Sequence, residues 1–412
     1  MRTINKTIVF AVSAWAVVSA VALTVVWHRG PGVAQARPAR PATPVVTPPP
    51  AAAELAPLDP PALPSRRVQL ALLLDTSSSM SGLINQARTQ LWRMVNQVGE
   101  LRYEGKPPEM EIALYEYGKS TLAAEGGYIR QILPLSSDLD RVSEELFGLT
   151  TQGGDEYCGQ VIERAVTDLQ WARSDEVLKL LFIAGNEPFT QGPVDYRQAI
   201  EAAAARGIRV GTIYCGDDKL GVETGWRDGA RIAQGRYLSI DHNRRVAHVA
   251  APQDDEIARL GARLNETYLP FGGAGKAALA RQNAQDHNAS LSGAGTVVQR
   301  SVSKANPWYD NSTWDLVDAR RDGAIDWSTI PVDQLPAPMR NLSEAEREEY
   351  LAKEGRRRAA LQQRINELNA DREAFVAARQ REVGAAAEGT LDRAIIAMVH
   401  DHANETATAA QP

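Results

Sequence analysis

The 412-residue sequence is poor in cysteine, histidine and aromatic residues. Its two cysteines exclude a fold that depends on several disulfides, which small secreted domains use in place of a large core. Lys and Arg number 45 against 51 Asp and Glu, a formal net charge of −6, so the chain lacks the basic balance of a nucleic-acid-binding protein. The length and a hydrophobic fraction of 44% suffice for one large α/β domain with extensions.

Charged residues are absent from an apolar run at residues 7–27, between Lys6 and His28. A helix of this length can cross a bilayer, so we expect residues 1–29 to be a transmembrane signal anchor in the inner membrane. A cleaved signal peptide is the alternative, because residues 34–36 resemble a small-residue cleavage site. Either segment would place the body of the protein in the periplasm or another extracytoplasmic space.

Large apolar residues are also scarce in residues 30–66, which hold eleven of the 23 prolines. A segment of this composition cannot bury a core and predicts an extended, polyproline-like linker. At about 3.1 Å per residue, such a linker reaches on the order of 100 Å.

From residue 67 onward, apolar segments alternate with amphipathic ones. Two segments, residues 68–74 and 177–184, are almost continuously apolar, as is typical of strands buried on both faces. Repeated strand–helix alternation predicts a doubly wound, mainly parallel six-stranded sheet with helices on both faces. The expected strands are residues 68–74, 110–117, 128–135, 177–184, 208–214 and 236–240. The expected helices are residues 82–101, 138–147, 156–171, 195–206, 223–234 and 254–264.

Oxygen-bearing side chains follow the first expected strand: Asp75, Ser77 and Ser79 stand at positions i, i+2 and i+4. Open α/β sheets bind ligands at the carboxyl ends of their strands. Hard oxygen ligands at this spacing suit Mg2+ or a similar cation. A Ser-rich turn that caps the following helix is an alternative interpretation, and it is compatible with the first.

The Asp-x-Ser-x-Ser pattern, between a buried strand and a helix, resembles the metal-ion-dependent adhesion site (MIDAS) of von Willebrand factor A (VWA) domains. The resemblance covers about residues 67–270, half of the chain, and implies a Rossmann-like sheet with one antiparallel strand. The whole sequence looks like that of bacterial exported or membrane-anchored VWA-domain proteins.

The second and third loops depart from the family pattern. Gly-Gly-Thr of the family is replaced by Gly153-Gly154-Asp155, and Thr-Asp-Gly is replaced by residues 184–187, which lack the Asp. Losing one carboxylate and gaining Asp155 leaves the number of carboxylates unchanged. We therefore expect Mg2+ (or Ca2+ or Mn2+) to be held by Asp75, Ser77, Ser79 and Asp155, with Asn186 or Glu187 acting through water. A degenerate site that binds no metal is the alternative.

The resemblance implies a binding protein. A cation held by few carboxylates keeps positive charge and an open coordination position, and the N-terminus of the helix after Ser79 adds to that charge. The expected partner is therefore a protein that presents an acidic residue. A non-metal scaffold or assembly protein with a degenerate MIDAS, acting through its helical tail, is the alternative.

An enzyme is not expected. A haloacid-dehalogenase-like phosphatase with Asp75 as nucleophile would need a second Asp where Ser77 stands, and a hydroxyl at its ordinary pKa is a poor general acid.

The two cysteines, Cys158 and Cys215, are both expected near the carboxyl edge of the sheet. In an oxidising periplasm they could form a disulfide that stiffens the second loop. Two buried thiols are the alternative.

Beyond the VWA-like region, we expect residues 271–340 to be an irregular extension rich in Gly and Trp. Its first part, residues 272–301, is predicted to be a loosely ordered connector. Trp308, Trp314 and Trp327 are expected to pack onto the α/β domain.

Residues 341–412 are expected to be a helical tail. Apolar residues within 342–383 are spaced for one helix face, but Arg358 and Arg372 fall at would-be core positions, which weakens a coiled-coil interpretation. A long amphipathic helix, docked or paired, is the prediction.

Overall fold

The computed structural model describes residues 67–244, 248–321, 323, 325–383 and 390–409, all of them within one unit, Leu58–Pro412. The predicted anchor and linker, residues 1–29 and 30–66, lie outside the described residues. No described helix is long and apolar enough to cross a membrane.

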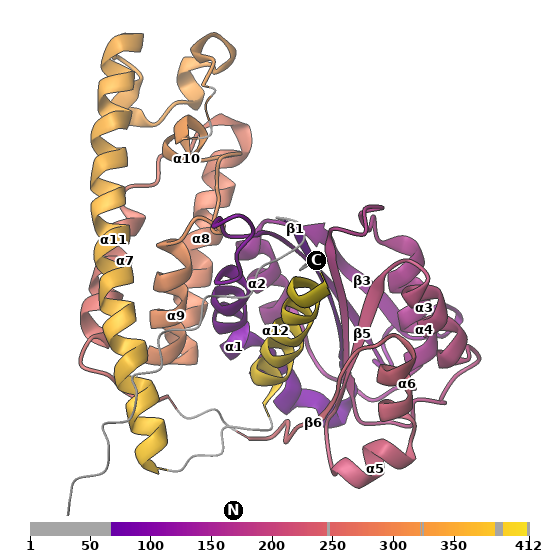
Figure 1. The fold of residues 1–412 in the computed structure, drawn as a ribbon. Helices are drawn as coiled ribbons and strands as arrows, with labels where there is room; N and C mark the ends of the chain where they lie inside the picture. Colours follow the sequence, from indigo (N-terminus) through magenta and orange to yellow (C-terminus); the bar gives the residue numbers. More distant parts are fainter. Residues whose placement is uncertain (1–66, 245–247, 322, 324, 384–389, 410–412) are drawn as a thin grey trace, which may run out of the picture. The chain divides into compact units, whose positions relative to one another are not determined.

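A six-stranded sheet with the order β3-β2-β1-β4-β5-β6 lies at the centre of the α/β domain (Figure 1). β3 is antiparallel to β2, and the other neighbours are parallel. The predicted doubly wound, mainly parallel sheet is therefore confirmed. Its strands are β1 (Arg67–Asp75), β2 (Glu109–Tyr117), β3 (Ile129–Ser136), β4 (Leu178–Gly185), β5 (Ile208–Tyr214) and β6 (Tyr237–Ser239).

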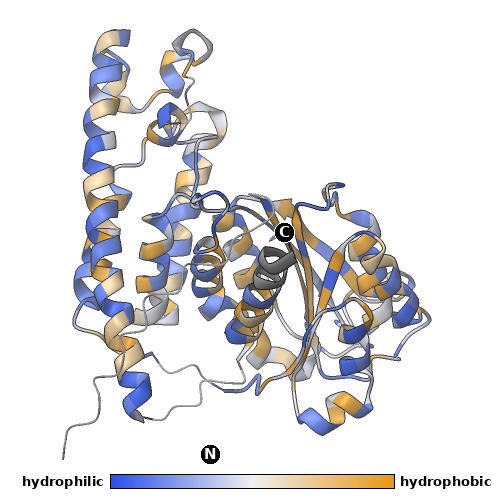
Figure 2. Cartoon of the chain, viewed as in Figure 1, coloured by the Kyte–Doolittle hydropathy of each residue, from blue (hydrophilic) through white to orange (hydrophobic). Residues whose placement is uncertain are grey.

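Each strand contributes to two cores, because successive side chains point to opposite faces of a sheet. In β1, Leu70, Leu72 and Leu74 enter one core, whereas Ala71 and Leu73 enter the other. Figure 2 shows the strands as the most apolar elements, surrounded by amphipathic helices that carry both hydrophobic and hydrophilic residues. The first face is covered by α1 (Ser81–Gly99), α2 (Leu139–Gly148) and α12 (Leu391–Ala409). The second face is covered by α3 (Cys158–Asp168), α4 (Tyr196–Ala204) and α6 (Trp226–Ile232).

The single helix predicted over residues 223–234 is in fact two, α5 (Asp218–Glu223) and α6. Gly225 separates them with a φ of +98°, a conformation that L-residues rarely adopt and that ends a helix.

α12, which is distant in sequence from the strands, completes the first face of the sheet. α12 packs against α1 and β5 and buries Leu391, Ile395 and Val399 in the same core as β1. The Met398 side chain fills the space that a Cβ on Gly211 of β5 would need. The boundary predicted at residue 270 therefore does not enclose the domain: residues 254–383 are an insertion between β6 and the last covering helix (Figure 1).

The insertion is mainly helical, so the prediction of a loosely ordered connector at residues 272–301 is wrong. Its helices are α7 (Asp254–Asn265), α8 (Gly272–Ser292), α9 (Ala294–Lys304), α10 (Leu316–Arg321) and α11 (Glu344–Val383). α8 and α9 bury polar side chains such as Gln282, Gln285 and Arg300. The sequence of α8 therefore lacks the apolar periodicity by which a packed helix is recognised, whereas α9 does place Val298 and Val302, four residues apart, in the core. Residues 305–340 are irregular as expected, with α10 and three short 3-10 turns.

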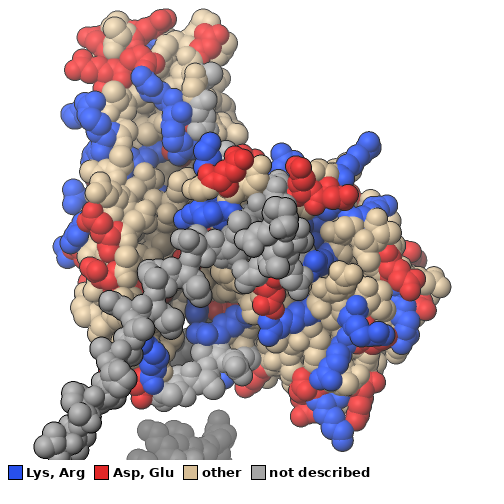
Figure 3. Space-filling model, in the orientation of Figure 1, with Lys and Arg blue, Asp and Glu red and all other residues tan. Residues whose placement is uncertain are grey.

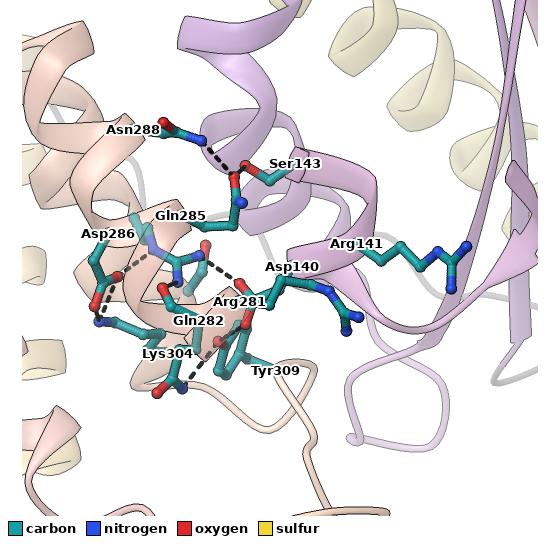
Figure 4. A network of polar contacts seen from close by, with 12 residues as sticks. Asp140, Arg141, Ser143, Arg281, Gln282, Gln285, Asp286, Asn288, Lys304 and Tyr309 are labelled. Atoms are coloured by element: carbon teal, nitrogen blue, oxygen red, sulfur yellow. Dashed lines mark hydrogen bonds and ion pairs between the residues drawn. The ribbon is translucent and has the colours of Figure 1, made fainter. Parts of the chain in front are cut away.

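A buried polar network joins α2 of the domain to α8 and α9 of the insertion (Figure 4). Arg300 donates to Asp140 (2.7 Å) and to Asp286, and its guanidinium lies 4.5 Å from the centre of the Trp92 ring. Lys304 lies 2.9 Å from Asp286. Although burial opposes it, Lys304 and Arg300 hold the pKa of Asp286 below its ordinary value.

α11 is a docked amphipathic helix, as predicted. Its buried residues follow alternating steps of three and four, which places them in one seam against α7 and α9. From Leu351 onward they are Leu351, Glu354, Arg358, Leu361, Ile365, Leu368 and Arg372; one further buried residue, Arg347, precedes them and donates to the carbonyl of Met339. The two arginines do occupy core positions, and each meets a buried acid: Arg358 pairs with Asp315 and Asp318, and Arg372 with Asp254.

The three tryptophans pack in different places. Trp314 is buried in the main core and Trp308 packs against its edge, as expected. Trp327 packs instead on a small separate core within the insertion, which includes Leu316 and Leu351.

We predict that Arg358→Met destabilises the protein by on the order of 3–5 kcal/mol, because it leaves Asp315 buried without its cation and Asp318 with only the more distant Arg321 (3.5 Å). Arg364→Met is the matched control, since Arg364 is exposed and pairs with the exposed Glu367. Its expected cost is about 1 kcal/mol or less. Urea denaturation measures both values, and equal costs for the two variants would contradict the prediction.

Ile395→Ala is predicted to cost about 2–5 kcal/mol, because Ile395 of α12 is 1% exposed in the core of the sheet. The neighbouring Ile396 is only half-buried, so Ile396→Ala provides a control of identical chemistry with a smaller expected cost. A loss of cooperative unfolding of the α/β domain in the first variant would further support its completion by α12. If Ile395→Ala left the unfolding midpoint unchanged, α12 would not be part of that core.

Candidate functional site

The candidate site lies between β1 and β4, where the order in which the strands follow one another across the sheet changes direction. β1 connects onward to β2 on one side, while its other neighbour, β4, leads to β5 and β6. The loops after β1 and β4 therefore diverge at the carboxyl ends of the strands, which is where open α/β sheets bind ligands. β1 ends at Asp75, and β4, paired with it in register, ends at Gly185.

The first loop holds the predicted oxygen ligands close together. Asp75 is fully buried, and its Oδ1 accepts a hydrogen bond from the backbone N–H of Ser77 (2.7 Å). The Oγ atoms of Ser77 and Ser79 lie 3.1 Å apart. Neither the 3-10 turn Ser78–Met80 nor α1 receives a hydrogen bond from a capping side chain. The serines therefore do not cap this helix, and their hydroxyls face the site.

In the second loop, the structure brings Glu156 rather than Asp155 to Asp75. Asp155 is exposed, whereas Glu156 is 6% exposed and its backbone N–H donates to Gln191 (2.6 Å). A Cβ at Gly118 would lie 2.7 Å from Cγ of Glu156 and 3.0 Å from Oδ1 of Asp75. Both acidic side chains thus pack against the same glycine at the end of β2.

The third loop contacts the first through Asn186. The amide of Asn186 donates to Oγ of Ser79 (3.3 Å). Glu187 is half-buried, and its carbonyl accepts a hydrogen bond from Trp226 (2.8 Å), which fixes the loop. The three loops therefore converge around Asp75.

The two buried carboxyls have strongly perturbed acidity. Burial raises the pKa of Asp75 to about 8; hydrogen bonds from Ser77 oppose this, and the charges of Glu156 and Glu187 add to it. Burial also raises the pKa of Glu156 to about 7, again with Glu187 adding to the rise. None of the interactions that shift these two pKa values is with a basic side chain. The part of the chain that the structure describes therefore concentrates acidic groups at this site and pairs neither Asp75 nor Glu156 with a basic side chain.

The cysteines lie beneath this site as free thiols, so the possible disulfide between Cys158 and Cys215 is not formed. Both are buried, and burial raises the pKa of each thiol. Sγ of Cys158 lies 3.9 Å from the hydroxyl of Tyr117, which donates to the carbonyl of Ala184. The two thiols are thus part of the packed interior beneath the site.

The donor set fits a hard divalent cation. Oδ2 of Asp75 is buried without a hydrogen-bond partner, an arrangement that a cation would satisfy. Among the described residues, no group of three or more His, Cys, Asp and Glu side chains forms a ready metal centre. A cation here would therefore need the hydroxyls of Ser77 and Ser79, together with water, beside the carboxylates.

A comparison with protein families agrees with this geometry. The model of the von Willebrand factor type A domain matches residues 69–221. This part of the chain forms a VWA domain. The match ends before β6 and α12, which complete the sheet and its first face.

Several solved structures resemble the VWA portion. BatB from Bacteroides thetaiotaomicron shares 16% identity over 42% of this chain and 90% of its own, with a TM-score of 0.33. The SpRpn10 VWA domain shares 14% identity over 42% of this chain and 88% of its own, also at 0.33. An aerotolerance-related membrane protein from Bacteroides fragilis NCTC 9343, with multiple mutations to serine, shares 16% identity over 43% of this chain and 93% of its own, at 0.29. Such low identities carry no function across. No curated protein matches the chain significantly.

Glu156 is the site residue that sequence reasoning missed. It stands next to Asp155, which occupies the position of the family's Thr, so the motif pointed to the wrong neighbour. The helix was expected to begin at residue 156, whereas α3 begins at Cys158 and leaves Glu156 in the loop.

We predict that the metal-free protein loses stability as pH rises. The folded-state pKa of Asp75, about 8, exceeds its ordinary value of 3.8, so the folded state holds this proton more tightly than the unfolded state. The stabilisation that the proton on Asp75 contributes to the folded state is complete below pH 3.8 and is lost as pH rises through about 8. Asp75→Asn should reduce the loss and, at pH 8 with a chelator, stabilise the protein by at least about 1 kcal/mol.

Denaturant titrations at several pH values measure this effect. Asp155→Asn serves as the control, because it removes a neighbouring but exposed carboxylate. An unchanged pH dependence in Asp75→Asn would contradict the raised pKa.

Proposed function

We propose that this protein is a membrane-anchored, extracytoplasmic VWA-domain protein that binds a partner protein through a divalent cation. The cation, Mg2+ or alternatively Ca2+ or Mn2+, would be held by Asp75, Ser77, Ser79 and Glu156, with Asn186 and Glu187 contributing through water. Bound there, it would offer an open coordination position to an oxygen atom of the partner. The proposed role is binding, without catalysis.

The observation that carries this proposal is the buried pair of carboxyls at the reversal point of the sheet. Asp75 and Glu156 pack against Gly118, and no basic side chain shifts their pKa values. Burying acids without a compensating charge destabilises a fold. A cation that binds only the folded state offsets this cost.

The scaffold alternative has one supporting observation. Acidic side chains gather where α11 begins, including the exposed Glu344, Glu346 and Glu349 (Figure 3). Deleting residues 342–412 would not separate the two functions, because the deletion also removes α12 from the core of the VWA domain. Substitutions on the surface of α11 are the suitable test of this alternative.

Calorimetric titration of Mg2+, Ca2+ and Mn2+ into the protein tests the proposed site. We predict saturable binding of at least one cation, abolished by Asp75→Ala. Glu156→Gln should weaken the affinity by about tenfold or more, because it removes a buried negative charge without changing the volume of the side chain.

Asp155→Asn distinguishes the two acidic neighbours of the second loop. Only a small change is expected, because Asp155 is exposed. If Asp155→Asn abolished binding and Glu156→Gln did not, Asp155 would be the ligand. If the wild-type protein took up none of the three cations, the degenerate site would be the correct interpretation.

A further inference from the structure

A cavity of about 620 Å3 lies apart from the proposed cation site, between the VWA domain and the inserted helices. Its described walls come from four places: α1, the segment after β6, the turn between α8 and α9, and α11. The volume falls within the range of small-molecule sites, about 300–1,000 Å3. None of the proposed cation ligands lines it. What the cavity binds is therefore independent of whether a cation binds at Asp75.

The lining of the cavity is polar. Among its described lining side chains, only those of Val249, Ala294 and Val376 are apolar, and none is aromatic. The others carry amide, hydroxyl, imidazole or charged groups. An apolar ligand would take from these groups the hydrogen bonds that water gives them, which is unfavourable. The cavity therefore favours a small, water-soluble and strongly polar ligand.

Three arginines, each from a different wall, bring N–H donors to the cavity: Arg93 of α1, Arg244 after β6 and Arg372 of α11. Two of them are held by buried acids that do not line the cavity. Arg93 lies 3.1 Å from Asp392, and Arg372 donates to Asp254 (2.8 Å). These pairings fix the positions of the guanidinium groups. A guanidinium has five N–H donors, more than the pairings use.

The formal charges around the cavity cancel. Glu373, which accepts from Arg372 (2.8 Å), is the one acid among the described lining residues. Together with Asp254 and Asp392, it offsets the three arginines. Net charge therefore does not decide what the cavity binds, and the balance of hydrogen-bond donors and acceptors does.

Two acceptor atoms of the lining are already engaged by the protein itself. Oε1 of Gln86 accepts from the backbone N–H of Leu391 (2.9 Å). Oε1 of Gln299 accepts from the side-chain amide of Asn96 (2.9 Å). Since acceptors of the lining are used internally while its arginines carry further donors, a ligand rich in acceptor atoms finds more partners than one rich in donors.

The fourth wall adds backbone donors. α9 begins at Ala294 after Gly293, without a hydrogen bond from a capping side chain, and its first residues line the cavity. The first N–H groups of a helix have no partner within the helix and favour acceptors or negative charge. This helix end strengthens an arrangement that the arginines already provide.

We propose that this cavity binds a small oxyanion, a molecule with a phosphate or carboxylate group, through Arg93, Arg244 and Arg372. Guanidinium groups match both kinds of oxyanion with paired N–H donors. A ligand that contacts α1 and the inserted helices together binds the folded protein and not the unfolded chain. It would therefore stabilise the packing of the insertion on the VWA domain.

Calorimetric titration into the full-length protein, freed of divalent cations with a chelating resin, tests this proposal. Inorganic phosphate and succinate are the probes, and they distinguish the two kinds of oxyanion. Succinamide, which has nearly the shape of succinate without its charge, is the control ligand. We expect saturable binding of at least one oxyanion, with succinamide at least about tenfold weaker. Binding of neither oxyanion, or equal binding of succinate and succinamide, would overturn the proposal.

Two substitutions test whether the oxyanion binds in this cavity. Asn85→Asp turns an exposed lining amide into a carboxylate, and Arg244→Gln removes an exposed lining cation. Each should weaken the affinity by about tenfold or more. Asn341→Asp and Arg364→Gln make the same charge changes at exposed positions outside the cavity and should change the affinity by less than about twofold. Wild-type affinity in both cavity variants, or equal losses in the controls, would show that the proposal is wrong.

Discussion

The chemistry of the site depends on one electrostatic constraint: two carboxyls, Asp75 and Glu156, are buried against the same glycine without a basic partner. Asp75 lies there because β1 runs through the middle of the sheet and ends where the strand order reverses. Glu156 lies there because backbone hydrogen bonds hold the second loop at the ends of two strands. The N–H of Ser120, after β2, donates to the carbonyl of Gly153 (2.5 Å), and the N–H of Gln152 donates to the carbonyl of Thr76, after β1 (2.9 Å). The fold thus holds acidic groups together that would separate in a flexible chain, and a proton or a cation must compensate them.

In the insertion, by contrast, buried basic and acidic side chains are paired with one another. Its buried Arg300, Arg358 and Arg372 each meet at least one acid, and two of them also lie over aromatic rings. Truncating one member of such a pair leaves the other charge unpaired in the interior. Acids are therefore buried in two ways in this chain. In the helical insertion they have cations from the chain itself, whereas at the candidate site they have none.

The contrast between these two regions explains what could be predicted from the sequence. The strands of the mainly parallel sheet and the Asp-x-Ser-x-Ser loop follow from apolar runs and local spacing, and both appear in the structure. α8 was missed because it packs through Gln282 and Gln285, which carry no apolar period. α9 does bury Val298 and Val302, but this pattern covers only the short segment Ala294–Lys304. Glu156 was missed because a motif fixes a position in the sequence, whereas the turn before α3 decides which of two adjacent acids faces inward. The role of α12 was missed because no local pattern shows that a helix at residue 391 packs on a strand at residue 211.

A single side chain shows why the domain and its insertion form one folded body. The amide of Gln86 in α1 donates to the carbonyls of Asp241 (2.9 Å) and His242 (3.1 Å), where the chain leaves the sheet. Its carbonyl accepts from the backbone N–H of Leu391 (2.9 Å), where the chain returns. Both ends of the insertion are therefore held at one buried point on α1, the helix that follows the serines of the site. Since α1, α9 and α12 share one core with β1, the inserted helices pack on the helix that follows Ser77 and Ser79. The helical region is for this reason better regarded as part of the support of the site than as a separate tail.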